Sequence, residues 1–428
     1  MACVCSCREV LLLAGMHIIA LTSIGSAIPC FSFFLVSIKD EFNTTSGLVG
    51  IANSLSIGLT ALLGPLASTM SRKYGYRSTV VIGGLSYSLG MMISSQVTQV
   101  WHLFFSHSLM TGAGVCICFQ TMVIYVNLNY KRSVSIANGV LFAAIGLGIL
   151  IIPLACSVLK MYYGWRGSLL IMGAVSLHSV VIATLIFRKD FYPMSEDDKK
   201  CSIDVITNNE DRDTILHNLR LFKKYPRLIL MTVATCFICV GYSGFYVHLI
   251  ASAIYKGVTD FQASIIFGAF GIGNLAGRVA NAIPLYFGWI SEYNLFIFCM
   301  FVITCTMSAV AVSQSFPSLL TFSLITGLFF GIYIPQIPAI VKEFVPKRVF
   351  ARAYGISLVP SGFTAIFGGY IVGALYDKIG NYKISFFFAA ANYLIVGIML
   401  TIAEIITKLR GKTQKISEEE DSDKETHV

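Results

Sequence analysis

Long apolar stretches separated by short polar turns run along almost the whole chain. Twelve of them approach or exceed the roughly 20 residues that an α-helix needs to cross a bilayer. They lie at residues 11–38, 47–70, 78–95, 103–126, 136–159, 167–187, 228–254, 262–284, 294–312, 318–341, 353–376 and 384–407. Because the apolar positions are continuous rather than alternating, they predict helices and not the strands of a barrel.

The polar interruptions divide the chain into four segments. We predict an N-terminal six-helix bundle at 1–190, a cytoplasmic central loop at 191–227, a C-terminal six-helix bundle at 228–410 and a disordered tail at 411–428. The central loop is rich in Asp, Glu, Lys and Asn and is too polar to pack. The fold class that follows is an all-α polytopic membrane protein with twelve transmembrane helices in two six-helix bundles.

Composition and charge agree with a membrane protein. The chain is 56% hydrophobic and 12% charged, with a mean hydropathy of +0.74, whereas soluble domains carry about 25% charged residues. We therefore expect membrane lipid to surround the protein. The net charge of +9 does not indicate a nucleic-acid partner, because no soluble basic domain is present to bind one.

The distribution of basic residues predicts the orientation. If both termini are cytoplasmic, 24 of the 31 Lys and Arg residues lie in inner segments and 6 lie in outer loops. This asymmetry is typical of cytoplasmic loops and predicts that both termini face the cytosol.

Sequence signatures of catalysis are missing. There is no His-Glu-x-x-His or Gly-x-Ser-x-Gly motif, and the 12 cysteines have no metal-ligand spacing. No Asp or Glu lies in the centre of a predicted span, and Glu343 and Glu404 lie at span ends. We therefore expect no enzyme activity, no cofactor and no metal site.

One charge falls inside a predicted span. Arg278 follows Asn274 by four residues, which places both on one helix face. Burying Arg in hydrocarbon costs about 2.5–3.5 kcal/mol on insertion scales, and its guanidinium fits a carboxylate in bidentate fashion. The pair is a candidate solute site. The alternative is that Arg278 extends to the cytoplasmic interface and only sets topology.

Four histidines also fall inside spans, at positions 17, 107, 178 and 248. Each is a candidate proton carrier. The alternative for a single histidine on an apolar helix is a hydrogen bond to a neighbour.

Further motifs lie at the turns between spans. The second span ends in Gly64-Pro65 and leads through Arg72-Lys73-Tyr74-Gly75-Tyr76-Arg77 into the third. The start of span six reads Gly164-Trp165-Arg166-Gly167, span eight holds Gly277-Arg278, and the link between spans eleven and twelve holds Asp377 and Gly380. Together these segments resemble the monocarboxylate transporters, solute carrier family 16 of the major facilitator superfamily.

This resemblance implies a major facilitator fold, in which two six-helix bundles rock around a central cavity. It also implies a small organic solute such as a monocarboxylate, a plasma-membrane location and, as in several members, a single-span immunoglobulin-like accessory glycoprotein. By the same resemblance, Arg278 binds the carboxylate and Phe330, in span ten, narrows the pocket. Ordinary packing is the alternative role for Phe330.

The chain departs from the family pattern at two sites of proton uptake. The first-span Lys of the lactate carriers falls on Cys30, and the span-eight Asp falls on Asn274. Since Asn cannot titrate, we expect a facilitative carrier of a small organic anion or zwitterion, with Arg278, Asn274, Phe330 and Cys30 as candidate solute contacts. A proton-coupled symporter and a non-transporting sensor or scaffold are the alternatives.

Overall fold

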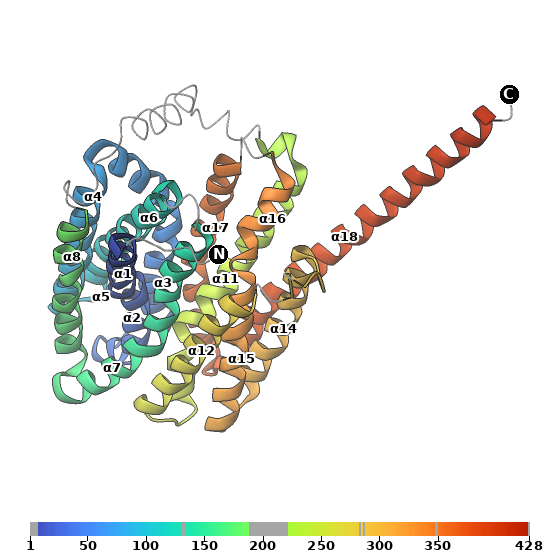
Figure 1. Cartoon of the computed structure of the whole chain (residues 1–428). Coiled ribbons are helices and arrows are strands. Elements are labelled where there is room, and N and C mark those ends of the chain that lie inside the picture. The colour runs from blue at the N-terminus through green and yellow to red at the C-terminus, as the bar shows by residue number, and fades with distance from the viewer. Residues whose placement is uncertain are drawn as a thin grey trace.

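The computed structural model describes residues 7–129, 134–187, 221–281, 284–285, 287–346 and 350–426. The described elements of the first half are α1 (Cys7–Thr22), α2 (Ile24–Glu41), α3 (Ser46–Leu62), α4 (Gly64–Ser95), α5 (Val100–Leu103), η1 (Phe104–Thr111), α6 (Gly112–Asn129), α7 (Val134–Ser176) and α8 (His178–Ile186). Those of the second half are α11 (Pro226–Tyr255), α12 (Asp260–Ala280), α14 (Glu292–Val312), α15 (Phe316–Tyr333), α16 (Gln336–Phe344), α17 (Phe350–Ile379) and α18 (Tyr382–Thr426). Figure 1 shows these two sets of helices side by side.

Ten described helical stretches are long and apolar enough to cross a membrane, and an eleventh is bent by 50° between α3 and the start of α4. The stretch at 138–186 counts as one although it has 49 residues, about twice the length that spans a bilayer. It contains Gly164 at a φ of +65°, where Figure 1 shows the chain reversing direction. With this break, the described stretches correspond to the twelve predicted spans.

The two halves pack along glycine-lined helix faces. Helix α3 of the first half lies against α17 of the second, where a Cβ added at Gly373 would lie 2.6 Å from the backbone nitrogen of Gly47. Helix α12 lies against α7, where a Cβ at Gly271 would lie 2.8 Å from the backbone nitrogen of Leu150. Small residues let helix backbones approach this closely inside lipid.

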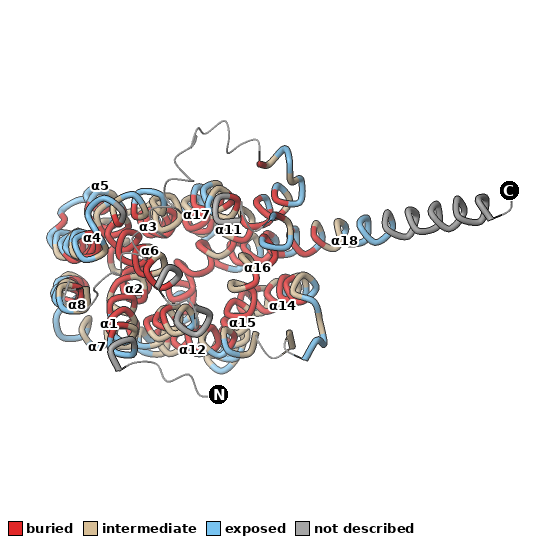
Figure 2. The backbone as a smooth tube through the Cα atoms, turned by 45° about the horizontal axis from the view of Figure 1, so that its top comes forward, coloured by how far each residue is buried: buried red, intermediate tan, exposed pale blue. Residues whose placement is uncertain are grey.

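Figure 2 shows that the buried residues lie mainly where the helices face one another and that exposed residues lie mainly on the outside. Leu89, Ile93, Val181, Leu185 and Phe363 are examples of large apolar side chains on this outer surface. Such a surface is suited to lipid and not to water.

The structure describes the residues at only some of the predicted domain boundaries. Most of the central loop, 191–227, lies outside the described residues, and helix α11 begins at Pro226. Helix α18 continues to Thr426 and projects away from the bundles (Figure 1). The helix thus covers the described part of the predicted tail at 411–428, a segment without proline. The disorder of this tail stays a prediction.

Candidate functional site

A glycine-lined contact between α12 and α15 positions the candidate site. A Cβ added at Gly277 would lie 2.0 Å from the carbonyl oxygen of Leu328, and one at Gly331 would lie 2.1 Å from that of Asn274. Gly273 and Gly327 make the same kind of close approach between the two helices. Small residues let the two backbones approach this closely, and the contact fixes the turn of α12 that holds Asn274 and Arg278.

Arg278 lies in the last turn of α12 and is half-buried. Its Nε donates a hydrogen bond of 3.1 Å to Oδ1 of Asn274. The guanidinium carbon is 5.6 Å from the ring centroid of Phe142, on α7 of the other half. The hydroxyls of Tyr242 and Tyr333 are close enough to interact with the guanidinium electrostatically. The side chain therefore lies between protein elements of both halves.

The charge of Arg278 has no carboxylate within 4 Å among the described residues. Asn274 is 3% exposed and contributes a neutral oxygen. Cation–π contact with Phe142 compensates only part of the cost of removing a guanidinium from water. An anionic guest would supply the missing counter-charge.

Phe330 is fully buried in an aromatic cluster of the second half. Its ring centroid is 5.4 Å from that of Phe270, 5.5 Å from that of Tyr333 and 5.6 Å from that of Tyr242. Two of these neighbours, Tyr242 and Tyr333, also face Arg278. Phe330 thus supports the tyrosines beside the guanidinium and has no exposed surface of its own in this conformation.

Cys30 lies elsewhere in the fold. It is fully buried on α2, with its Sγ 3.4 Å from Sγ of Cys156 on α7. No contact joins it to Arg278 in the described structure, so the structure does not bring these two candidates together.

The motif between spans two and three forms a turn at one end of the first half. Pro65 occupies the first turn of α4, which begins at Gly64, and Gly75 breaks this helix with a φ of +81°. Glycine is the residue that adopts this backbone conformation without a steric penalty. Lys73 and Arg77 are exposed, and the side chain of Arg72 lies outside the described part.

Trp165 and Arg166 connect three helices by hydrogen bonds at the opposite end of the first half. The Trp165 indole N–H donates to a carboxylate oxygen of Glu41, and Arg166 donates to the other at 2.9 Å from Nε and 2.7 Å from Nη2. Nη1 of Arg166 also donates to the carbonyl of Ser95 at 2.8 Å. These two motif residues hold the ends of α2 and α4 beside α7 and do not contact Arg278.

Asp377 joins the two halves at that same end. Its carboxylate accepts hydrogen bonds from the backbone nitrogens of Ser46, at 2.9 Å, and Gly47, at 2.8 Å. These are unsatisfied donors at the first turn of α3, where negative charge is stabilised. Gly380 ends α17 with a φ of +73°, and its N–H donates to the carbonyl of Tyr376 at 2.7 Å.

The end that holds these links is called the outer end below, after the predicted topology. Nζ of Lys160 on α7 is 2.7 Å from Oδ2 of Asp260 on α12, which forms a second link between the halves. A further polar link between the halves is a 3.1 Å hydrogen bond from the Gly369 backbone nitrogen to Oγ of Ser54. The outer end is therefore held closed.

The intramembrane histidines all have hydrogen-bond partners. His17, His178 and His248 lie 2.7–2.9 Å from backbone carbonyls. His107 lies 3.4 Å from Oδ1 of Asn53 and stacks on Phe31. Hydrogen bonding to a neighbour was one of the two roles that the sequence left open for these residues.

Several residues of the site were not found from the sequence. Phe142 lies under the guanidinium of Arg278, and Tyr242 and Tyr333 interact with it electrostatically, but all three look like ordinary apolar span positions in the sequence. Glu41, the partner of Trp165 and Arg166, looks like part of a polar turn. Only a pairing of helices far apart in sequence reveals these contacts.

The sequence model of the Major Facilitator Superfamily matches residues 12–293 and 282–425. The chain therefore belongs to this superfamily and is a multi-pass secondary membrane transporter, not an enzyme.

Its relatives include monocarboxylate transporter 12 of Homo sapiens, which is 24% identical over 94% of this chain and 82% of the relative. Monocarboxylate transporter 6 of Mus musculus is 26% identical over 88% of this chain and 83% of the relative. Monocarboxylate transporter 13 of Bos taurus is 26% identical over 87% and 84%. These relatives confirm the resemblance that the motifs predicted.

Solved structures confirm the major facilitator fold. A mutant of the nucleoside transporter NupG superposes with a TM-score of 0.74 at 12% identity, covering 92% of this chain and 99% of that one. A D-xylose-proton symporter superposes with a TM-score of 0.73 at 12% identity, covering 91% and 97%. At this identity the likeness concerns the fold alone.

Proposed function

We propose that the protein carries a small organic monocarboxylate or zwitterion across the membrane as a facilitative carrier. Arg278 binds the carboxylate, and Asn274 orients the guanidinium. Phe330 shapes the site indirectly by supporting Tyr242 and Tyr333, and Cys30 stays a candidate contact on the resemblance alone. The proposal agrees with the relatives, which are monocarboxylate transporters.

One observation carries this proposal. The half-buried guanidinium of Arg278 lies between the two halves beside Phe142 and has no acidic partner among the described side chains. A guanidinium in this setting offers paired N–H donors that match a carboxylate, and a ligand there touches both halves at once. Contact with both halves is what alternating exposure of one site requires.

Asn274 supports facilitative transport. It occupies the position where the resembling proton-coupled carriers have Asp, and its amide accepts from Nε of Arg278 at 3.1 Å. An amide neither gains nor loses a proton in the physiological range. Substrate binding at Arg278 therefore needs no prior protonation of its neighbour.

The setting of the carrier rests on the sequence and the resemblance. We propose the plasma membrane as its location, with both termini in the cytosol, because the basic residues are concentrated in the inner segments. A single-span immunoglobulin-like glycoprotein is the proposed accessory subunit. Surface expression with and without such a subunit tests this last point.

The direct test is solute uptake into proteoliposomes that contain the purified protein. A labelled panel of lactate, pyruvate, aromatic amino acids and creatine identifies the solute, and an imposed proton gradient tests coupling. We expect uptake of at least one carboxylate, no stimulation by the gradient and at least about a tenfold loss in Arg278→Ala, since a charge-assisted hydrogen bond contributes about 1.5–3 kcal/mol.

Arg227→Ala is the matched control, because Arg227 is an exposed arginine of the same half and is expected to leave uptake unchanged. Uptake at the wild-type rate in Arg278→Ala would reject the site. Solute that binds to the protein but never equilibrates across the vesicle would instead support the sensor or scaffold.

A further inference from the structure

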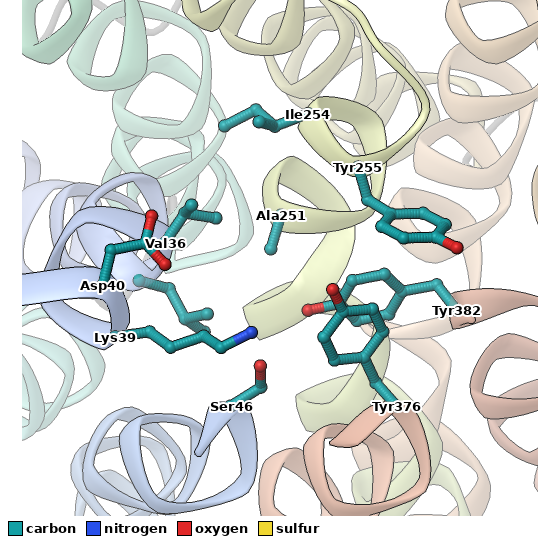
Figure 3. A pocket seen from close by; sticks show the side chains of 10 residues that line it. Val36, Lys39, Asp40, Ser46, Ala251, Ile254, Tyr255, Tyr376 and Tyr382 are labelled. Atoms are coloured by element: carbon teal, nitrogen blue, oxygen red, sulfur yellow. The ribbon is translucent and has the colours of Figure 1, made fainter. Parts of the chain in front are cut away.

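A cavity of about 130 Å³ opens at the outer end, between the two halves. Its lining comes from α2, the first residue of α3, α11, α17 and α18 (Figure 3). A buried water needs about 10–15 Å³ by this kind of measure, so the cavity has room for roughly ten non-hydrogen atoms. This is the size of a small organic acid and not of a macromolecule.

Lys39 supplies a cation to this cavity. Its Nζ points into the space (Figure 3) and lies 4.9 Å from the ring centroid of Tyr376. No carboxylate lies within 4 Å of it among the described residues. Two other lysines of the outer end are already engaged: Lys160 pairs with Asp260, and Lys256 donates to the carbonyls that end α14. Lys39 is therefore free to meet an anion.

Aromatic rings form the opposite wall. The rings of Tyr376 and Tyr382 stack with their centroids 4.0 Å apart, and Tyr255 meets Tyr376 edge-on at 5.5 Å. The Tyr382 hydroxyl lies 3.3 Å from Nδ1 of His248, whose Nε2 lies 2.9 Å from the carbonyl of Gly369. Because that carbonyl can only accept, Nε2 carries the proton and Tyr382 donates to Nδ1. This hydrogen bond holds the aromatic wall in place.

Ser46 adds a polar group beside Lys39. The side chain is fully buried, yet its hydroxyl makes no hydrogen bond of normal length and angle within the described structure. It lies beside the Tyr382 hydroxyl and faces the same space as Nζ of Lys39 (Figure 3). Because Tyr382 donates its own proton to His248, its oxygen is left to accept from Ser46. Ser46 therefore supports the aromatic wall beside Lys39.

Close packing of α3 against α11 and α17 separates the cavity from the interior of the protein, where Arg278 lies. A Cβ at Gly50 would lie 2.6 Å from the carbonyl oxygen of Gly369 and 2.7 Å from Nε2 of His248. A Cβ at Gly373 would be equally close to Gly47. A solute in the cavity thus reaches it from the outer side and is stopped at this contact in the present conformation.

We propose that this cavity is an outer binding site, distinct from Arg278, at which a monoanionic or zwitterionic carboxylate waits before the outer end opens. The carboxylate binds Lys39, and the body of the solute packs on the rings of Tyr376 and Tyr382. Asp40, which also lines the cavity, repels a second negative charge on the solute and forms an ion pair with the amino group of a zwitterion. The choice of a carboxylate rests on the proposed function.

The test is equilibrium binding of labelled phenyllactate to the protein in nanodiscs, with the Arg278→Ala variant as background so that the inner site is silent. We expect the Arg278→Ala protein still to bind phenyllactate weakly. Adding Lys39→Gln should raise the dissociation constant at least about tenfold, the effect of losing one charge-assisted hydrogen bond. Lys383→Gln is the matched control, because Lys383 is an exposed outer lysine that does not line the cavity. The dianion succinate should compete poorly with phenyllactate for the cavity. It should compete better in the Asp40→Asn variant, which lacks the repelling charge.

Two results would overturn the outer site: no binding in the Arg278→Ala background, or equal binding in the Lys39→Gln and Lys383→Gln variants. If Arg278→Ala fails to fold, Arg278→Gln is the background, because it removes the charge and keeps most of the side-chain volume, with the same expected contrast between the lysine variants. Failure of the proposed function looks different. Wild-type uptake in Arg278→Ala would reject the inner site, whereas a binding loss specific to Lys39→Gln would still support the outer one.

Discussion

The pair formed by Asn274 and Arg278 decides how this carrier responds to charge. The amide accepts from the guanidinium at 3.1 Å and leaves the positive charge uncompensated. A carboxylate at the same position would neutralise it. Under the proposed function, this amide lets Arg278 bind a carboxylate without a proton being taken up at position 274.

Asn274→Asp should make uptake depend on protons. At neutral pH the new carboxylate pairs with Arg278 and competes with the solute. As the outside pH falls, the carboxylate is protonated and the guanidinium becomes free, so uptake should rise. Uptake in vesicles between pH 5.5 and 8 measures this, with wild type expected to lack the rise. Equal pH profiles for the two proteins would contradict the role given to Asn274.

At the residue scale, the sequence predicted Arg278 and Asn274 from their types and spacing alone. It could not predict Phe142, which is 5.6 Å from the guanidinium, because contacts between distant helices leave no local pattern. Glu41 was missed for a related reason. A carboxylate at a span end is normally solvated, and only the folded chain brings Trp165 and Arg166 to it.

At the scale of elements, the α12–α15 contact holds the site together. The glycines of both helices place backbone against backbone, so the position of Arg278 depends on residues that never touch a solute. The sequence shows two of these glycines, Gly273 and Gly277, four residues apart in span eight. It did not indicate the partner helix, since several spans contain glycines.

Gly331→Ala should destabilise the protein and lower uptake. The added Cβ would lie 2.1 Å from the carbonyl oxygen of Asn274, so the helices must separate at a cost of about 1–3 kcal/mol. The melting temperature in detergent measures the loss. Gly355→Ala is the matched control, because nothing lies within 4 Å of the added Cβ there. Equal melting temperatures for the two variants would contradict the tight contact.

At the scale of the whole molecule, polar links close the outer end. Asp377 caps the first turn of α3, and Lys160 pairs with Asp260. The sequence places Asp377 in a motif between spans eleven and twelve, but its partner on the other half follows only from the fold. These links must break before the outer end can open.

Lys160→Asp should favour the outward-open state. Partly exposed ion pairs contribute about 0.2–1 kcal/mol, so we expect the outward-open population to rise by up to about fivefold. Electron–electron distance measurement between spin labels at Met161 and Lys383, both exposed, reports on this opening. The charge-swapped pair Lys160→Asp with Asp260→Lys should restore the wild-type distribution. A double variant as open as the single one would show that the pair is not a link.

The central claim is that Arg278 is kept between the two halves because a carboxylate binds it. Its most direct test is the ratio of uptake rates for a transported carboxylate and its neutral amide, in wild type and in Arg278→Ala. The account predicts that wild type favours the carboxylate by at least about tenfold and that the variant loses this preference. A variant that keeps the full preference would show that the carboxylate is bound elsewhere.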